Sequence, residues 1–156
     1  MGQEIERKFL VVNDDWRQGV KGKLYRQGYI PTADARTVRV RVVEDRGYLT
    51  LKGPVSNLTR PEFEYDIPLT DAQTMLDTLC EPPLIEKYRY RLPIGALVWE
   101  IDEFLGANSG LIIAEVELNA PDQSIELPSW VGTEVTDDKR YYNANLVRHP
   151  FCRWNL

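Results

Sequence analysis

Apolar and polar residues alternate along most of this chain with the two-residue period of a β-strand. Near the start, Glu4, Glu6 and Lys8 fall on one side of such a strand, and Ile5 and Phe9 fall on the other. Similar alternation, rich in β-branched and aromatic residues, predicts strands at about residues 3–11, 24–30, 37–43, 47–52, 62–68, 86–92, 97–104 and 111–118. Short turns between several of them favour antiparallel pairing.

Three helical segments interrupt this pattern. The clearest is residues 70–80, where apolar positions recur with helical spacing. Its apolar face is formed by Ala72, Met75, Leu76 and Leu79. A short helix is predicted near 13–18, and a third follows Thr136-Asp137-Asp138 and runs to about Arg148.

One face of nearly every predicted strand is charged, and the opposite face is apolar. The charged positions are Glu4, Glu6, Lys8, Arg39, Arg41, Lys52, Glu62, Glu64, Lys87, Arg89, Asp102, Glu115 and Glu117. A solvated outer face is the ordinary interpretation for any one strand. Solvated faces usually mix signs, however, whereas Arg39/Arg41 and Glu115/Glu117 place like charges side by side. The pattern therefore predicts an eight-stranded antiparallel closed β-barrel with a charged interior and helices packed outside.

Composition narrows the class of protein. The 156 residues, 43% hydrophobic and 28% charged, fit one globular domain spanning 1–156. A net charge of −5 argues against binding nucleic acid through a basic surface. Cys80 and Cys152 form no disulfide or zinc pattern, and the single histidine, His149, leaves no material for a histidine triad. With no signal peptide and no membrane-length apolar run, we expect a cytoplasmic protein without a membrane partner.

The charged lining indicates what would bind inside. Unpaired buried charge is costly, so the six cations imply a ligand with several negative charges. The seven carboxylates imply hard divalent cations, and Mg²⁺ or Mn²⁺ fits better than zinc, which favours histidine and thiolate. A polyphosphate with one or two such ions would satisfy both halves.

The opening EIERKFL segment resembles the ExExK signature of the CYTH superfamily, the triphosphate tunnel metalloenzymes. The resemblance continues in order through Gln27-Gly28-Tyr29, Arg39-Val40-Arg41, Thr50-Leu51-Lys52-Gly53, Glu86-Lys87-Tyr88-Arg89-Tyr90 and Ala114-Glu115-Val116-Glu117-Leu118. It implies an α+β, mainly β fold in which the barrel forms a triphosphate tunnel, with a C-terminal plug helix at one end.

The resemblance also implies roles for individual residues. Triphosphate ligands would be Lys8, Arg39, Arg41, Lys52, Lys87 and Arg89, with Arg60 and Lys139 added. Metal ligands would be Glu4, Glu6, Glu115 and Glu117, supported by Glu62, Glu64 and Asp102. Glu62 or Glu64 would orient the attacking water or take its proton, and Lys52 would also stabilise the transferred group. Lys139 would reach in from the plug, or else is an ordinary exposed lysine. Tyr29 would position a nucleophile, although a packing role is the interpretation we favour.

We therefore expect metal-assisted hydrolysis of inorganic triphosphate to pyrophosphate and phosphate. The alternatives left open are a class IV type adenylate cyclase, a thiamine or nucleoside triphosphatase, and a non-enzymatic polyphosphate- or RNA-binding module. The inward carboxylates argue against the last, because a pure anion binder gains nothing from acids beside its ligand. A homodimer formed through outer apolar strands is a further expectation.

Overall fold

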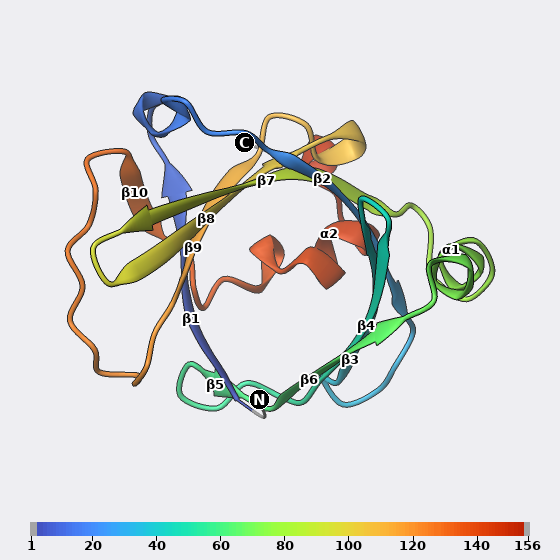
Figure 1. Cartoon of the computed structure of the whole chain (residues 1–156). Coiled ribbons are helices and arrows are strands. Elements are labelled where there is room, and N and C mark those ends of the chain that lie inside the picture. Colours follow the sequence, from blue (N-terminus) through green and yellow to red (C-terminus); the bar gives the residue numbers. More distant parts are fainter. Residues whose placement is uncertain (1–2, 155–156) are drawn as a thin grey trace.

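In the computed structural model, residues 3–154 are described, and they form a ten-stranded antiparallel sheet that curves round a central space (Figure 1). The strands are β1 (Glu4–Val11), β2 (Lys23–Ile30), β3 (Thr37–Val43), β4 (Arg46–Lys52), β5 (Thr59–Arg60), β6 (Glu62–Ile67), β7 (Ile85–Ile94), β8 (Leu97–Phe104), β9 (Ile112–Glu117) and β10 (Val131–Glu134). Their order is β10-β1-β9-β8-β7-β2-β3-β4-β6, and β5 pairs with β1.

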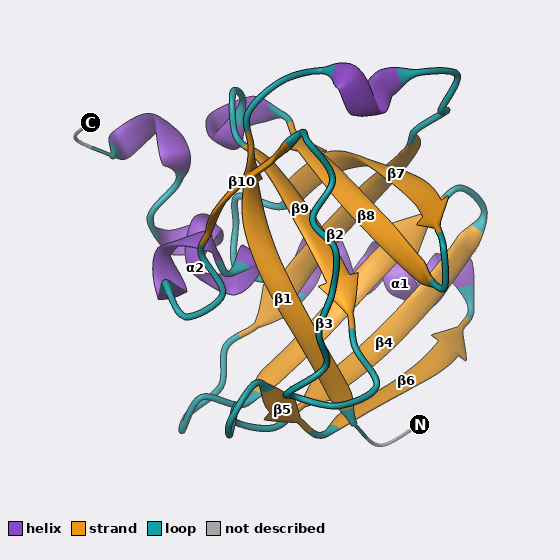
Figure 2. Cartoon of the chain, turned by 90° about the vertical axis from the view of Figure 1, so that its left-hand side faces the viewer, coloured by secondary structure: helices purple, strands orange, loops and turns teal. Residues whose placement is uncertain are grey.

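Two α-helices and four short 3₁₀ helices complete the described part of the chain. The α-helices are α1 (Leu69–Thr78) and α2 (Asn143–Arg148), and the 3₁₀ helices are η1 (Asp15–Arg17), η2 (Gly106–Asn108), η3 (Lys139–Tyr141) and η4 (Phe151–Arg153). Helix α1 packs outside the sheet against β3 and β4, whereas α2 lies at one end of the ring of strands (Figures 1 and 2). None of the helices within residues 3–154 has the length and apolar character needed to cross a membrane.

The predicted eight-stranded closed barrel is wrong in strand number and in closure. The sequence pattern missed β5 and β10, and within the described residues no ladder joins β6 directly to β1. Instead β1 pairs with β5, through Glu4↔Arg60 and Ile5↔Thr59. Pro61 stands between β5 and β6, and it has no N–H to donate to a ladder. The sheet therefore curls round without continuous hydrogen bonding between its two ends.

The eight predicted strands are otherwise confirmed, with ends shifted by at most a few residues. The helix predicted to follow Thr136-Asp137-Asp138 and run to about Arg148 is wrong as one element, because extended backbone at Tyr142 separates η3 from α2. The helix near 13–18 is the single 3₁₀ turn η1. The predicted apolar face of α1 holds at Ala72 and Leu76, which are buried, but Leu79 is 53% exposed.

Cross-strand register places the charged residues on one common face. Residues directly opposite each other in an antiparallel pair point to the same side of the sheet. Lys8 lies opposite Glu115, and Lys52 lies opposite Glu62. Since β-strand side chains alternate in direction, the whole charged set faces the space inside the ring.

Apolar side chains cover the outside of the sheet in two clusters. One lies between α1 and the β3–β4 face and contains Val40, Val42, Ala72, Leu76 and Cys80. The other lies under η1 and the segment that links β9 to β10, and it contains Phe9, Trp16, Trp99, Ile101, Ala114, Val116, Leu118 and Trp130. Burial of such side chains contributes about 1.5–3 kcal/mol each, so the hydrophobic stabilisation lies largely outside the ring.

A third apolar cluster closes one end of the ring. It joins Ile85, Phe104 and Ile113 on the inner face to Leu146 and Val147 of α2. These strand positions have the same parity as the charged positions further along, so the inner face changes from apolar to charged along its length. The apolar contact explains why α2 sits at this end.

We expect Trp99→Ala to lower the free energy of unfolding by about 3–5 kcal/mol, because it removes a large buried ring and leaves a cavity. Trp99 is 1% exposed, and its ring centroid lies 5.7 Å from that of Phe9 and 5.5 Å from that of Trp130. Urea unfolding measures the change. Leu79→Ala is the control and should cost no more than about 0.5 kcal/mol; equal losses would contradict this assignment of the core.

Candidate active site

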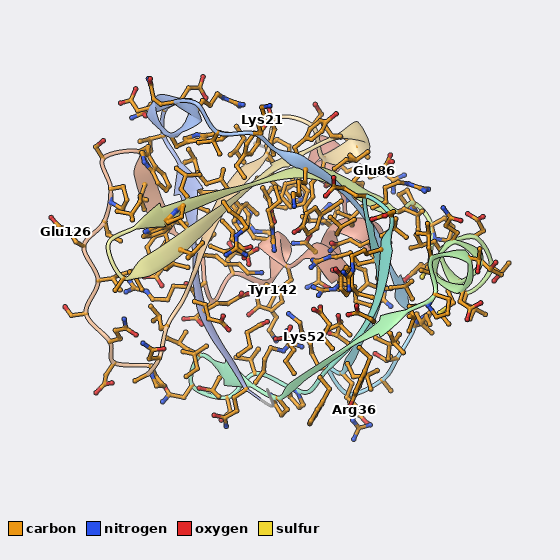
Figure 3. The ribbon with its side chains drawn as sticks, in the orientation of Figure 1. Lys21, Arg36, Lys52, Glu86, Glu126 and Tyr142 are labelled. Carbon is orange, nitrogen blue, oxygen red and sulfur yellow. The ribbon has the colours of Figure 1, made fainter. Side chains whose placement is uncertain are left out.

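The curved sheet encloses a cavity of about 590 Å³. All the candidate site residues from the sequence line it except Asp102; those residues are Glu4, Glu6, Lys8, Tyr29, Arg39, Arg41, Lys52, Arg60, Glu62, Glu64, Lys87, Arg89, Glu115, Glu117 and Lys139. Figure 3 shows Lys52 and Tyr142 pointing into this space, while Lys21, Glu86 and Glu126 lie outside the ring. The strand pattern thus brought together side chains that are far apart in sequence.

The enclosed space continues away from α2. A second hollow, of about 620 Å³, is also lined by Arg41, Glu64 and Arg89. Because these three residues line both hollows, the two hollows adjoin. The second one also touches the turn between β3 and β4, through Val43, Glu44, Asp45 and Arg46.

Charges inside the ring are sorted by sign into two arcs of neighbouring strands. The strands β7, β2, β3 and β4 are consecutive in the sheet and carry Lys87, Arg89, Arg39, Arg41 and Lys52. Strands β6, β1, β9 and β8 supply Glu62, Glu64, Glu4, Glu6, Glu115, Glu117, Glu100 and Asp102. Strand β5 pairs with β1 and leads through Pro61 into β6, so it lies between the two strands in this second arc, and Lys8 on β1 and Arg60 on β5 are cations within it.

In the cationic arc, hydrogen bonds to neighbouring side chains hold Arg39 and Arg41 in place. Arg41 Nε donates to Gln27 Oε1 at 2.8 Å. Arg39 Nη2 donates to Thr50 Oγ1 at 3.1 Å and to Glu64 Oε2 at 3.3 Å. Arg39 Nε is buried and has no hydrogen-bond partner within residues 3–154. A buried donor without a partner is destabilising, and a phosphate oxygen would satisfy it.

Asp102 is the one proposed metal ligand that does not line the cavity, and it binds two cations. Its Oδ1 accepts from Arg89 Nε at 2.7 Å, and its Oδ2 accepts from Lys87 Nζ at 2.7 Å and from Arg89 Nη2 at 2.8 Å. Burial alone would raise the pKa of Asp102, but the charges of Arg89 and Lys87 outweigh burial and hold the pKa well below its usual range. With both oxygens engaged, this carboxylate anchors the cationic arc.

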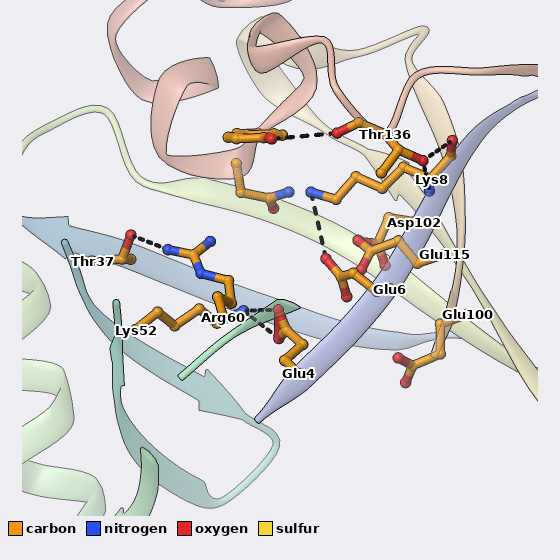
Figure 4. A network of polar contacts seen from close by, with 12 residues as sticks. Glu4, Glu6, Lys8, Thr37, Lys52, Arg60, Glu100, Asp102, Glu115 and Thr136 are labelled. Carbon is orange, nitrogen blue, oxygen red and sulfur yellow. Dashed lines mark hydrogen bonds and ion pairs between the residues drawn. The ribbon is translucent and has the colours of Figure 1, made fainter. Parts of the chain in front are cut away.

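In the acidic arc, Glu4, Glu6 and Lys8 project from β1 to the same side of the strand, with Glu4 beside Lys52 (Figure 4). Lys52 Nζ donates to both oxygens of Glu4, at 3.0 and 2.7 Å. Lys8 Nζ lies 3.8 Å from Glu6 Oε1, and Arg89 Nη2 lies 3.5 Å from Glu115 Oε1. Lysines and arginines thus neutralise part of this arc.

Burial, reinforced by neighbouring carboxylates, raises several pKa values in the acidic arc. Burial, together with Glu115 and Glu4, raises the pKa of Glu6 to about 8. Burial and Glu4 raise the pKa of Glu62 and of Glu117. Burial also acts to raise the pKa of Glu115, but Lys8 and Arg89 lower it to about 2. The raised pKa values of Glu6, Glu62 and Glu117 indicate that positive charge is lacking near these three carboxylates.

Divalent metal suits these donors chemically, because Mg²⁺ and Mn²⁺ prefer carboxylate oxygen. In the described part of the chain, no three acidic, histidine or cysteine side chains are grouped closely enough to hold an ion as they stand. Glu4 in particular is engaged by Lys52. The donor set fits, and side-chain rotation away from the lysines would be needed to use it.

Arg60, Lys139 and Tyr29 line the cavity and also have contacts or surroundings of other kinds. Arg60 donates to the Gly53 carbonyl at 2.9 Å and to Thr37 Oγ1 at 3.2 Å. Lys139 is exposed on η3 and reaches the cavity lining. Tyr29 is 9% exposed, belongs to the apolar cluster beneath α2, and accepts a hydrogen bond from Gln27 Nε2 at 2.9 Å.

Sequence reasoning missed several residues of the cavity. Glu100 shares the strand parity of Asp102 and lies 3.3 Å from Arg89, so the alternation in β8 already contained the signal. Tyr142 lies with its ring centroid 4.9 Å from Lys8 Nζ. Asn143 accepts a hydrogen bond from Lys87 Nζ at 3.0 Å. The last two come from the irregular C-terminal segment, where no periodic pattern indicates direction.

A sheet curved round sorted charges is the architecture of a known class of domain. Residues 2–149 match the CYTH domain, and the chain belongs to that family.

Individual relatives agree with this assignment. The chain is 50% identical over 151 residues, 97% of each protein, to an inorganic triphosphatase of Acetivibrio thermocellus. It is 40% identical over 153 residues to an inorganic triphosphatase of Nitrosomonas europaea, covering 92% of this chain and 96% of that one. A crystal structure of an inorganic triphosphatase superimposes with a TM-score of 0.67 at 34% identity, covering 92% of this chain and 96% of that chain.

We expect Glu6→Gln to change how stability depends on pH. In the folded chain Glu6 keeps its proton up to about pH 8, whereas its ordinary pKa is 4.5. The wild-type free energy of unfolding therefore falls as pH rises through this window, by at most about 1.4 kcal/mol per pH unit for one proton. Glu6→Gln has no proton to lose, so its stability relative to wild type should increase from about pH 5 to about pH 8.

Urea unfolding in EDTA at a series of pH values measures this difference. Glu103→Gln is the control, because hydrogen bonding from Arg17 lowers the pKa of Glu103 and its titration ends below the window. Its stability difference from wild type should stay constant there. A constant difference for Glu6→Gln as well would contradict the assigned environment of Glu6.

Proposed function

We propose that this protein hydrolyses inorganic triphosphate to pyrophosphate and phosphate with Mg²⁺ or Mn²⁺, one or two ions, inside the curved sheet. The observation that carries the proposal is the sorting of charge into two facing arcs around one cavity. A linear triphosphate matches the cationic arc, and metal ions bound to the substrate match the acidic arc. The similarity to inorganic triphosphatases supports the same substrate.

The cationic arc would bind the phosphate oxygens. Arg39, Arg41 and Arg89 present planar guanidinium groups that can bind two oxygens at once, whereas Lys52 and Lys87 act as point charges. Such groups stabilise the charge that spreads over the transferred phosphoryl group. Lys8 lies within the acidic arc, where it would bind an oxygen close to the metal side.

The acidic arc would hold the metal and the water. Glu4, Glu6, Glu115 and Glu117 are the proposed ligands, and a bound divalent ion would offset phosphate charge and lower the pKa of a water molecule. Glu62 or Glu64 would orient that water or accept its proton, and the raised pKa of Glu62 suits a proton acceptor. The water oxygen attacks a terminal phosphorus, and the bond to the pyrophosphate oxygen breaks.

Two assignments are adjusted by the geometry. Asp102 is better regarded as an anchor for Lys87 and Arg89 than as a metal ligand. Tyr29 lines the cavity through a buried hydroxyl, so a role in positioning the substrate is compatible with its packing role. A cytoplasmic location and a homodimer remain proposals from the sequence.

An adenylate cyclase would bind the triphosphate of ATP in the same cavity. A Bacillus halodurans structure described as a candidate adenylate cyclase shares the fold, with a TM-score of 0.63 at 19% identity, covering 78% of this chain and 84% of that one. A cyclase must also seat adenine and ribose and activate a ribose hydroxyl, and we identify no described residues arranged for that. Thiamine and nucleoside triphosphates stay as alternative substrates.

We expect purified protein with Mg²⁺ or Mn²⁺ to release phosphate from tripolyphosphate much faster than from ATP or thiamine triphosphate. The physical reason is that charged side chains line the cavity, as a linear triphosphate requires, whereas we identify no described residues arranged to bind a nucleobase. Phosphate release and pyrophosphate formation are measured for each substrate. Cyclic AMP as the main product from ATP, with little phosphate from tripolyphosphate, would refute the proposal in favour of a cyclase.

We expect Glu115→Gln to lower kcat about 100-fold or more and to raise the Mg²⁺ concentration needed for half-maximal rate. Loss of a group that only supports a metal ligand already costs about 10–100-fold. Glu103→Gln is the matched control, because Glu103 bonds Arg17 and Tyr90 and does not line the cavity. Unchanged metal dependence in Glu115→Gln would contradict its assigned role, as would tighter tripolyphosphate binding with intact turnover.

A further inference from the structure

We propose that Asn143 is a positioning residue: from the first position of α2, it holds buried cations of the cationic arc in place. The proposal rests on the proposed triphosphate function. Asn143 Oδ1 accepts a hydrogen bond from Lys87 Nζ at 3.0 Å and another from Gln27 Nε2 at 3.2 Å. One amide oxygen therefore joins side chains from β7 and β2.

Both of these partners lead on to an arginine. Gln27 is fully buried, and its Oε1 accepts from Arg41 Nε at 2.8 Å. Lys87 is 1% exposed and bonds Asp102, which also binds Arg89. A continuous chain of hydrogen bonds thus runs Arg41, Gln27, Asn143, Lys87, Asp102, Arg89. It crosses the cationic arc and contains three of its cations.

This chain of hydrogen bonds is anchored at Asn143. This residue begins α2, which is held against the end of the sheet by Leu146 and Val147, 0% and 3% exposed. An apolar contact of this kind is rigid, because closely packed side chains do not deform continuously. The position of the helix is thereby transmitted to Lys87 and, through Gln27, to Arg41.

An amide suits this place better than a carboxylate. Its oxygen accepts two hydrogen bonds without adding negative charge beside the phosphate-binding cations. Aspartate would keep the acceptor but neutralise part of the charge available to the substrate, and alanine would remove the acceptor altogether. The two substitutions therefore separate positioning from charge.

We expect Asn143→Ala to lower kcat/KM for tripolyphosphate about 10- to 100-fold, because small displacements of binding groups lose productive geometry. Asn143→Asp should recover most of kcat while raising KM. Asn108→Ala is the matched control. Asn108 is 5% exposed, and its Oδ1 accepts a hydrogen bond from Phe151 N at 2.8 Å. This bond anchors the C-terminal segment at a place away from the cationic arc. Asn108→Ala should lower stability with little effect on kcat. Urea unfolding of every variant confirms folding.

A double-mutant cycle that combines Asn143→Ala with Gln27→Ala tests the chain of hydrogen bonds. If Asn143 and Gln27 act through the same contacts, the double variant should lose little more than the more affected single variant, whereas independent sites add. Additive losses would overturn the proposal. So would an Asn143→Ala enzyme that behaves like Asn108→Ala.

A binding experiment distinguishes an error in the proposed hydrolase function from an error in the proposed role of Asn143. Calorimetric binding of tripolyphosphate in EDTA needs no turnover, and Asn143→Ala should weaken that binding about 10-fold relative to both wild type and Asn108→Ala. An inactive wild type that shows this difference would refute the hydrolase and support the positioning role. Equal affinities in all three proteins would refute the positioning role.

Discussion

The constraint on which this structure depends is the neutralisation of charge on the inside of a curved sheet. A buried charge is tolerated only when it is paired or bound to a ligand. The cationic arc meets this requirement partly within the chain, since Asp102 alone binds both Lys87 and Arg89. The acidic arc meets it less completely, and burial with neighbouring carboxylates keeps the pKa of Glu6 near 8. The two arcs are therefore incomplete in complementary ways, one lacking anion and the other lacking cation.

Placing charges inside moves the hydrophobic stabilisation to the outside of the ring. Helix α1, the η1 turn and the β9–β10 segment cover the outer face of the sheet, while the C-terminal segment covers its apolar end. The site is consequently held in place by contacts that do not touch a ligand. A change at Trp99, which lies in the outer apolar cluster, therefore acts on folding first.

Sequence alternation predicted most of this arrangement because strand parity decides which face a residue occupies. It found the eight longer strands and nearly the whole charged lining. It missed β5 and β10, of two and four residues, which are too short to show a period. Closure of the ring could not be predicted, because it depends on where Pro61 interrupts pairing, and Asn143 was missed because η3 and α2 have no strand parity. Parity assigned Asp102 to the correct face, but only the fold shows that cations occupy both of its oxygens.

Lys52 links the two arcs. Its Nζ bonds both oxygens of Glu4 and lies 3.6 Å from Glu62 Oε2, so one lysine is shared between two carboxylates of the acidic arc. Under the proposed function the same lysine binds phosphate. A divalent ion beside Glu4 would replace Lys52 as its counter-charge and leave the ammonium group to the substrate. Since each ligand would release a group that the other uses, the affinities for metal and for triphosphate should rise together, and linkage requires the effect to be equal in both directions.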